Sequence, residues 1–322
     1  MDSFWQKLKK PAVVLAPMAD VTDPAFRQII AKYGKPDVMW TEFVSADGMF
    51  LGGEKAYNLL MRDLAYSEQE RPIVAQMFTS DPGRIKKAAE LCRKLGFDGF
   101  DINMGCPDRN IEKQIAGSAL IKHPELAREL ILAAKEGAGN MPVSVKTRIG
   151  YTKNEIEHWL PNLLEAEPAV VILHARTRKE LSKVPARWDV IERAVEIRDE
   201  YKSKTLILGN GDVSTIGEAY KRAEETGCDG VMVGRGIFGN PWFFNRSVSK
   251  EELSAKQILD VLVEHTKLYE ELLPDKNFSV MKKHFKAYTS GFMGAGELRE
   301  KLMSTKNAKE VEDVIHSYTL TL

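Results

Sequence analysis

Short apolar runs recur along the first 240 residues, and each is followed by a stretch whose apolar residues have helical spacing. Eight runs share this pattern and are rich in Val, Ile and Leu: Ala12–Pro17, Val38–Phe43, Pro72–Phe78, Gly99–Asn103, Pro142–Thr147, Ala169–His174, Thr205–Asn210 and Gly230–Gly234. Continuous apolar runs are typical of strands covered on both faces in parallel sheets. A strand, a helix and their loops together fill about 30 residues, so the pattern predicts eight βα units.

The stretches between the runs have the periodicity and start signals of helices. One stretch places its apolar residues at i, i+3, i+4, i+7 and i+8, at Ile156, Trp159, Leu160, Leu163 and Leu164. Asp23-Pro24 and Asp81-Pro82 precede two other stretches. An aspartate followed by proline predicts an N-cap and a first helical turn.

Eight βα units fit a closed (β/α)8 TIM barrel, which would end near residue 240. The alternative is an open doubly wound sheet, which expects fewer strands and a glycine-rich turn after the first strand. Here the first run ends in Ala16-Pro17-Met18, without glycine. The remaining residues have little strand pattern. We therefore predict an α/β fold with a TIM-barrel domain at 1–244 and a small C-terminal α-helical domain at 245–322.

Composition narrows the class of protein without identifying it. The chain has 322 residues, of which 43% are hydrophobic and 29% charged, as is usual for globular proteins. Its three cysteines form no C-x-x-C pair, so we expect a reducing compartment and no disulfide framework. The N-terminal stretch lacks a signal-peptide core, and no run of 18 apolar residues occurs. We therefore expect a cytoplasmic protein with no membrane partner.

Net charge is zero, but the charge is unevenly distributed. The segment 274–310 carries eight Lys or Arg residues and four Asp or Glu residues. A basic face on a helical domain can bind phosphates. A solvated helix surface explains the same count, and the sequence leaves both interpretations open.

Polar residues stand at or just after the ends of seven of the eight runs: Glu42, Gln76, Asn103, Lys146, His174, Asn210 and Arg235. In such barrels the C-terminal ends of the strands carry the functional site. The pattern indicates a site for one polar, planar ligand, although ordinary loop polarity is the alternative. Too few His or carboxylate partners converge there for a metal, so we predict no metal site.

The turns after the seventh and eighth runs, Asn210-Gly211-Asp212 and Gly234-Arg235-Gly236, indicate phosphate binding. Barrels commonly bind phosphate at these two strand ends. Glycine lets the backbone approach the oxygens, and arginine can pair with them in a bidentate manner. Simple turn glycines are the alternative.

Cys106 follows the fourth run, in the longest predicted βα loop, which continues through Gly117-Ser118. A long loop at the functional face is a candidate substrate loop. A thiol with an ordinary pKa of about 8.5 is protonated at neutral pH and can donate a proton. The alternative is a small buried apolar residue, which we expect for Cys92 and Cys228.

These residues lie in segments that resemble the dihydrouridine synthases, FMN enzymes that reduce uridine in tRNA using NADPH. The segments are APMADVTDPAFR (16–27), TEF (41–43), VAQMF (74–78), DINMGCP (101–107), AGSALI (116–121), VSVKTRIG (143–150), HARTR (174–178), NGD (210–212) and GCDGVMVGRG (227–236). The segment 285–303 resembles the family's helical domain. The resemblance spans roughly residues 12–310.

The resemblance implies the following roles. The FMN would be held by Pro17, Met18, Ala19, Gln76, Lys146, His174, Asn210, Gly211, Asp212, Gly234 and Arg235. Asn103, Arg176 and Arg178 would bind the substrate, and Cys106 would donate a proton to C5 of the uracil. The partners implied are tRNA and NADPH, and we expect a monomer.

Three positions depart from the family pattern. Asp20 stands where glycine is common, Asp108-Arg109-Asn110 replaces a small residue and lysine, and Leu181 replaces a frequent aromatic residue. The first two leave open which uridine is modified. Two other functions are kept as hypotheses: an FMN barrel acting on a small molecule, and a non-catalytic RNA-binding barrel.

Overall fold

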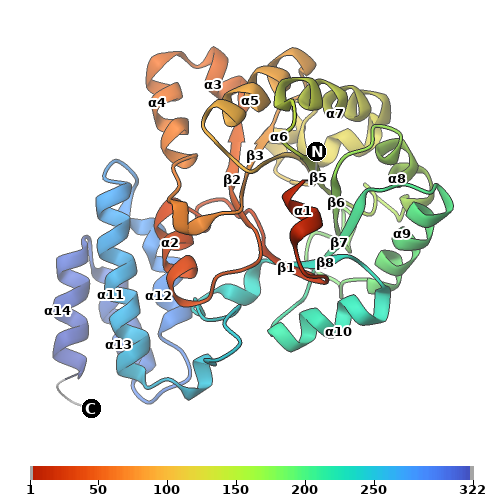
Figure 1. Cartoon of the computed structure of the whole chain (residues 1–322). Coiled ribbons are helices and arrows are strands. Elements are labelled where there is room, and N and C mark those ends of the chain that lie inside the picture. Colours follow the sequence, from red (N-terminus) through yellow and green to blue (C-terminus); the bar gives the residue numbers. More distant parts are fainter. Residues whose placement is uncertain (1–2, 320–322) are drawn as a thin grey trace.

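The computed structural model describes residues 3–319, and eight parallel strands form its centre (Figure 1). Each overlaps one predicted run: β1 (Ala12–Leu15), β2 (Met39–Ser45), β3 (Ile73–Phe78), β4 (Gly99–Met104), β5 (Val143–Arg148), β6 (Val170–His174), β7 (Leu206–Asn210) and β8 (Gly230–Val233). Their order in the sheet is β1-β8-β7-β6-β5-β4-β3-β2. The Leu15 amide donates to the Val38 carbonyl at 3.0 Å, which joins β1 to the start of β2. The predicted TIM barrel is confirmed.

Helices connect successive strands and surround the barrel (Figure 1). The helices up to the last strand are α1 (Phe4–Lys7), α2 (Pro24–Tyr33), α3 (Ala46–Leu51), α4 (Gly53–Asp63), α5 (Pro82–Lys94), α6 (Arg109–Glu112), α7 (Pro124–Ala138), α8 (Ile156–Leu164), α9 (Trp188–Glu200) and α10 (Ile216–Thr226). Short 3₁₀ segments add η1 (Glu68–Glu70), η2 (Gly117–Lys122) and η3 (Arg235–Ile237).

Two helix starts form as their sequences predict. The Asp23 carboxylate accepts from the Phe26 amide at 2.9 Å, and Asp81 accepts from the Arg84 amide at 2.7 Å. Proline follows each cap in the first turn, where its missing N–H leaves no hydrogen bond unmade. These caps set where α2 and α5 begin, and therefore the lengths of the loops after β1 and β3.

Two apolar layers hold the barrel. Side chains on one face of the strands fill the interior, among them Val14, Ile172 and Leu208, while the other face packs against the helices. This division follows from the alternation of side chains along a strand. At the N-terminal end of the strands, Trp5 of α1 packs on Trp40 with ring centroids 5.9 Å apart. The interior is thus closed at that end and functional residues gather at the opposite one.

The chain continues after β8 into further helical segments that lie beside α2 (Figure 1). They are η4 (Lys250–Glu252), α11 (Ala255–Leu272), η5 (Phe278–Met281), α12 (Lys282–Tyr288), α13 (Ala295–Ser304) and α14 (Ala308–Thr319). The boundary at 244/245 stays a prediction. Within residues 3–319, no helix combines the length and apolarity needed to span a bilayer.

Two fully buried histidines, His265 of α11 and His284 of α12, pack against Phe26 of α2. Their ring centroids are 4.7 Å apart, and Phe26 stacks on His265 at 4.9 Å. None of their ring nitrogens has a hydrogen-bond partner within residues 3–319. Burial, with a smaller contribution from the charge of Lys283, lowers the pKa of His284 to about 3. Both histidines are therefore neutral in the folded protein, and protonating either of them would destabilise this packing.

Replacing His284 by phenylalanine is expected to reduce the acid sensitivity of the fold. The unfolded pKa of histidine, about 6.5, lies above the folded value, so stability is lost as the pH falls from 6.5 towards 3. At pH 5 this loss amounts to about 2 kcal/mol for one such histidine. Urea unfolding at pH 7 and pH 5 should show a smaller difference for His284→Phe than for the wild type.

The exposed His316→Gln serves as the control, since it changes a histidine of the same segment outside the buried pair. Asp23, also buried, has its pKa raised to about 7, first by desolvation and then by Glu42. The contribution of Asp23 to the pH dependence of stability has the opposite sign to that of His284. It is the same in the wild type, His284→Phe and His316→Gln. Equal acid sensitivity in His284→Phe and the wild type would contradict the prediction.

Candidate functional site

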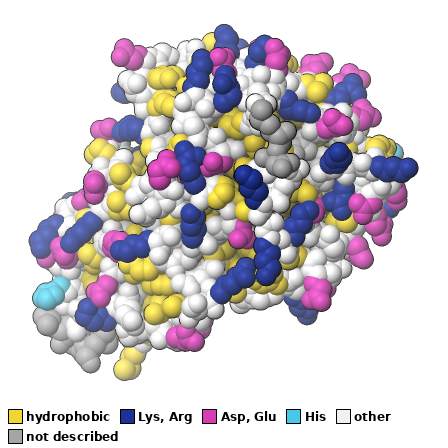
Figure 2. Space-filling model, in the orientation of Figure 1, with side chains coloured by type: hydrophobic (Ala, Val, Ile, Leu, Met, Phe, Trp, Pro, Cys, Tyr) yellow, Lys and Arg dark blue, Asp and Glu magenta, His cyan; other side chains and the backbone are white. Residues whose placement is uncertain are grey.

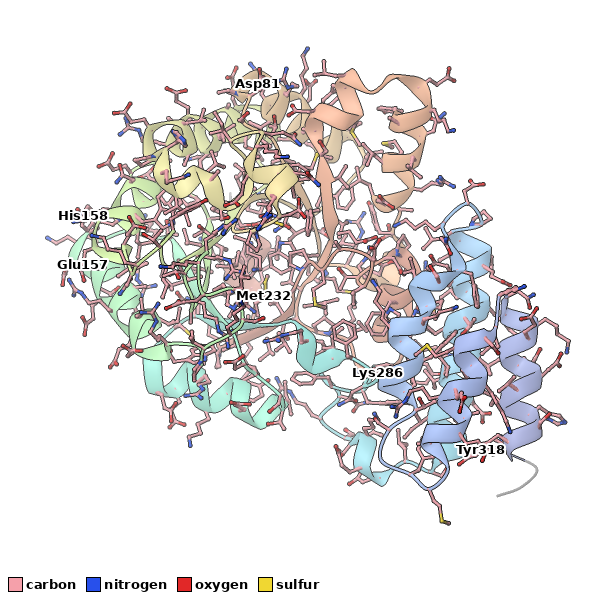
Figure 3. All side chains as sticks on the ribbon, turned by 180° about the vertical axis from the view of Figure 1, so that it is seen from behind. Asp81, Glu157, His158, Met232, Lys286 and Tyr318 are labelled. Atoms are coloured by element: carbon pink, nitrogen blue, oxygen red, sulfur yellow. The ribbon has the colours of Figure 1, made fainter. Side chains whose placement is uncertain are left out.

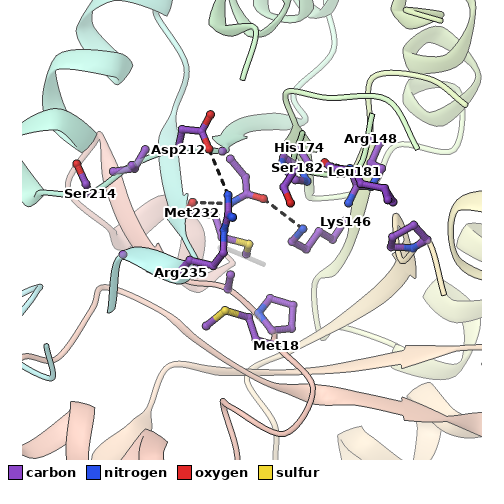
Figure 4. A pocket seen from close by; sticks show the side chains of 18 residues that line it. Met18, Lys146, Arg148, His174, Leu181, Ser182, Asp212, Ser214, Met232 and Arg235 are labelled. Carbon is purple, nitrogen blue, oxygen red and sulfur yellow. Dashed lines mark hydrogen bonds and ion pairs between the residues drawn. The ribbon is translucent and has the colours of Figure 1, made fainter. Parts of the chain in front are cut away.

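A cavity of about 820 Å³ opens at the C-terminal ends of β1 and β5–β8 (Figure 4). Its lining comes from strand ends and from the loops that follow them: Ala16, Pro17, Met18, Pro107, Lys146, Arg148, His174, Leu181, Ser182, Asn210, Gly211, Asp212, Val213, Ser214, Met232, Gly234, Arg235 and Gly236. Pockets of 300–1,000 Å³ hold most cofactors and drug-sized ligands. The cavity is therefore large enough for a mononucleotide cofactor.

The structure brings most of the predicted cofactor residues to this cavity. Nine of the eleven line it: Pro17, Met18, Lys146, His174, Asn210, Gly211, Asp212, Gly234 and Arg235. Ala19 is exposed in the loop after Met18, and Gln76 is buried within the barrel. Neither is among the lining residues. The role of each residue stays a prediction.

Lys146 reaches the cavity from β5, and Figure 4 shows it across from Arg235. Its Nζ lies 3.4 Å from Oδ1 of Asn210, whose Nδ2 donates to the Met232 carbonyl at 2.7 Å. Burial, followed by the charge of Arg148, lowers the pKa of Lys146 to about 8. An ammonium held beside a single neutral acceptor favours an anionic or electron-rich ligand.

Arg176 connects His174 to the two turns predicted to bind phosphate, Asn210-Gly211-Asp212 and Gly234-Arg235-Gly236. Its Nη1 lies 3.1 Å from His174 Nε2, and its Nη2 pairs with Asp212, which also lies 3.3 Å from Arg235. A guanidinium only donates, so His174 Nε2 accepts and the ring proton sits on Nδ1. Burial, then Arg148 and Lys146, keeps the pKa of His174 well below 6.5. His174 is therefore a neutral, oriented ring.

Backbone shape at the turn after β7 requires glycine. Gly211 has φ 134°, and a Cβ there would lie 2.8 Å from the Ala186 side chain and 3.3 Å from the His174 ring. Asp212 follows with φ 49°. Successive N–H groups in such a turn can line an anion-binding concavity. The turn after β8 places Arg235 beside it, as the sequence predicts.

Cys106 sits on a loop that is fixed from both sides. The Cys106 amide donates to Asn103 Oδ1 at 2.9 Å, and its carbonyl accepts from the Ser118 amide at 2.9 Å. Arg148, which lines the cavity, donates to the Gly105 carbonyl at 2.8 Å, and the next residue after Cys106, Pro107, lines the cavity as well. Cys106 itself is not a lining residue: its half-buried side chain packs against the apolar cluster of Phe78, Ile111 and Ala116, next to the cavity lining at Pro107.

The protonation state of Cys106 follows from its surroundings. Desolvation raises the pKa of the thiol above its ordinary value, with Arg148 and Lys146 opposing the shift only in part. A raised pKa keeps the group protonated at neutral pH. The resting thiol is consequently protonated, and its role stays a prediction.

Gln76 and Asn103 form a buried chain beneath the cavity together with Asp101, which the sequence analysis missed. Asn103 Nδ2 donates to Gln76 Oε1 at 3.1 Å, and Gln76 Nε2 donates to Asp101 Oδ2 at 2.5 Å. Ser144 also donates to Asp101. Burial raises the pKa of Asp101 to about 6. The sequence did contain a signal for Asp101, because Asp101 and Asn103 are two positions apart on the same strand and therefore point to the same face.

The two arginines predicted to bind substrate do not lie open in the cavity. Arg176 is 2% exposed and engaged with His174 and Asp212. Arg178 pairs with Glu112 of the Cys106 loop, its Nε donating at 2.8 Å. Arg148, by contrast, lines the cavity, although the sequence analysis assigned it no role. The K-x-R pattern on β5 was the available signal, since alternation places both residues on one face.

The arrangement combines three chemical capacities around one cavity. The lining offers cationic groups at Lys146, Arg148 and Arg235 and a neutral imidazole at His174. The protonated thiol belongs to Cys106, the residue before Pro107 of the lining. Such a set can bind an anionic planar ligand and deliver a proton to a carbon that becomes electron-rich.

Comparison with known proteins gives a match over almost the whole chain. The family model described as Dihydrouridine synthase (Dus) matches residues 14–321. The chain is 41% identical over 320 residues to a probable tRNA-dihydrouridine synthase 2 of Bacillus subtilis (strain 168), covering 98% of this chain and 97% of that protein. It is 40% identical to a probable tRNA-dihydrouridine synthase of Staphylococcus aureus (strain COL), covering 98% and 96%.

Solved structures resemble the barrel at low sequence identity. Morphinone reductase in complex with tetrahydroNAD has a TM-score of 0.52 at 15% identity, covering 74% of this chain and 87% of that chain. Histamine dehydrogenase from Rhizobium sp. 4-9 has a TM-score of 0.54 at 13% identity, covering 80% and 49%. At such identities the likeness concerns the fold alone.

Proposed function

Because the chain belongs to the dihydrouridine synthase family, we propose that it uses FMN to reduce uridines in tRNA to 5,6-dihydrouridine, with NADPH as reductant. Membership of the family confirms the expected enzyme class, a flavin-dependent oxidoreductase. The observation that carries the finer proposal is the single cavity that combines a phosphate-type turn, buried cations and an adjacent protonated thiol.

The residues around the cavity fit FMN. Arg235 and the backbone of Gly211 and Gly234 would hold the phosphate, because they offer a cation and unhindered N–H groups. Lys146 and His174 would contact the isoalloxazine ring, with Met18 and Pro17 at its edge. The Lys146 ammonium would stabilise negative charge on the reduced ring. Bound and reduced, the flavin supplies a hydride for C6 of the uracil.

Cys106 would complete the reaction on the uracil. Hydride addition at C6 leaves enolate-like charge on the base, and a proton at C5 removes it. The Cys106 thiol has the required proton because its pKa is raised by burial. Asn103 holds the Cys106 amide and so would fix the height of the thiol above the base.

A uracil within folded RNA must leave its stack to reach the cavity. We propose that the helical segment after residue 244 grips the RNA backbone. Lys282 and Lys286 of α12 have no carboxylate partner among the described residues, and Figure 3 shows Lys286 on the side of the helices facing the barrel. Figure 2, which shows the molecule from the opposite side, has Lys and Arg side chains interspersed with Asp and Glu side chains. A tRNA substrate would agree with the predicted cytoplasmic location, and the proposal requires only a monomer.

The proposed cofactor can be tested by the ultraviolet–visible spectrum of the purified protein. We expect flavin bands that bleach when NADPH is added and return with tRNA that lacks dihydrouridine. Denaturation should release FMN rather than FAD. Sequencing of tRNA from a deletion strain should show the loss of dihydrouridine at defined positions, restored by the wild-type gene.

Three results would decide against the proposal. A protein that neither contains nor takes up a flavin would overturn the cofactor assignment. A flavoprotein that is reoxidised by small unsaturated carbonyl compounds but not by tRNA would instead favour a small-molecule oxidoreductase, and a flavin-free protein that still binds tRNA would favour a non-catalytic RNA-binding barrel.

A further inference from the structure

One lysine of the C-terminal helical segment is inserted between two carboxylates of the barrel. Lys276 lies between α11 and η5, and its Nζ is 2.8 Å from Asp63 Oδ1 and 3.2 Å from Glu42 Oε2. The three side chains are only 16%, 17% and 7% exposed. Desolvation alone would lower the pKa of Lys276, yet Glu42 and Asp63 raise it. The lysine is therefore a fixed charge within the junction.

Both carboxylates depend on that charge. Asp63 is the last residue of α4, where the negative end of the helix dipole disfavours an anion. Glu42 is 5% exposed in the middle of β2, and a buried carboxylate without a cation is costly. Without Lys276, the two carboxylates would repel each other, and Glu42 would be driven towards its protonated form.

Glu42 in turn holds the loop that borders the cavity. Its Oε1 accepts the Asp20 amide, and Asp20 has a left-handed backbone with φ 54°. Two residues earlier, the Met18 amide donates to the Thr22 hydroxyl at 2.9 Å, and Met18 lines the cavity. The chain of contacts thus runs from Lys276 through Glu42 and Asp20 to Met18.

We propose that Lys276 is a positioning residue, which acts through Glu42 to fix the Met18–Thr22 turn and thereby couples the helical segment to the wall of the cofactor cavity. The identity of the ligand rests on the proposed function, but the coupling itself does not. Binding of a partner to the helical segment would therefore affect the cavity wall at the edge of the flavin through this ion pair.

The test replaces Lys276 by methionine, which keeps the length of the side chain and removes its charge. Hydrogen–deuterium exchange of the peptide covering residues 16–22 should become about tenfold faster, as expected when a charge-assisted hydrogen bond becomes a neutral one. The visible spectrum of bound FMN should shift in its fine structure. Lys276→Arg should restore both signals.

Arg62→Met is the matched control, since Arg62 pairs with Asp275 at the same junction, is more exposed and does not touch Glu42. If Lys276→Met fails to fold, Glu42→Gln weakens the same acceptor and should give the same faster exchange. Wild-type exchange rates in Lys276→Met, or equal acceleration in Arg62→Met, would overturn the inference. A wild type without flavin would overturn the proposed function only, because the exchange measurement needs no cofactor.

Discussion

Replacing Cys106 by alanine is expected to lower dihydrouridine formation by about 10²- to 10⁴-fold, the usual contribution of a positioned general acid. FMN content and tRNA affinity should change little, because the hydrogen bonds that fix the loop at this position do not involve the thiol. That role belongs to the backbone of Cys106, which alanine retains. Single-turnover reduction of tRNA by the pre-reduced protein measures the step directly.

Cys92→Ala provides the control for loss of a thiol, since Cys92 is buried in α5, outside the cavity. It should lower stability without affecting turnover. Cys106→Ser should recover little activity, because a hydroxyl is a much weaker acid than a thiol. An unchanged yield of dihydrouridine in Cys106→Ala would remove Cys106 from the mechanism and leave Lys146, which lines the cavity, as a candidate donor.

Replacing Lys146 by methionine is expected to weaken FMN binding by about 10- to 100-fold at pH 7, the value of a hydrogen bond to a charged group. In the wild type the pKa of Lys146 is lowered to about 8, and a bound anion raises it again. Affinity should therefore be full below pH 8 and fall about tenfold by pH 9. Fluorescence titration across this pH range measures both effects.

The variants separate charge from packing. Lys146→Met should show weak binding that does not vary between pH 7 and pH 9, and Lys146→Arg should bind without the fall above pH 8, because a guanidinium stays protonated. The same fall in Lys146→Met and the wild type would mean that another group, such as the cofactor itself, titrates in this range.

Local sequence rules were sufficient for the barrel because each of its elements is locally determined. The apolar runs reproduce all eight strands to within two residues, and the Asp-Pro caps give the starts of α2 and α5. Turn chemistry likewise predicts Gly211 and Arg235 at the cavity. Such features need only strand alternation, capping and backbone sterics.

Contacts between side chains that are far apart in the sequence could not be predicted from these local rules. The ion pairs of Lys276 with Glu42 and Asp63 join residues more than 200 positions apart, and no spacing rule predicts them. The buried position of Arg176 depends on Asp212 from the next strand. Asp101 was missed because a carboxylate inside a barrel is unexpected until its partners, Gln76 and Ser144, are seen.

The left-handed backbone at position 20 changes the meaning of one difference from related sequences. Glycine adopts this shape freely, and aspartate is among the few other residues that tolerate it. Exchange between aspartate and glycine preserves the path of the main chain, and the backbone amide of either residue can donate the same hydrogen bond to Glu42. Aspartate here thus keeps the main-chain path that glycine would give, and its carboxylate adds an ion pair that glycine cannot make, 3.9 Å from Lys283 of α12.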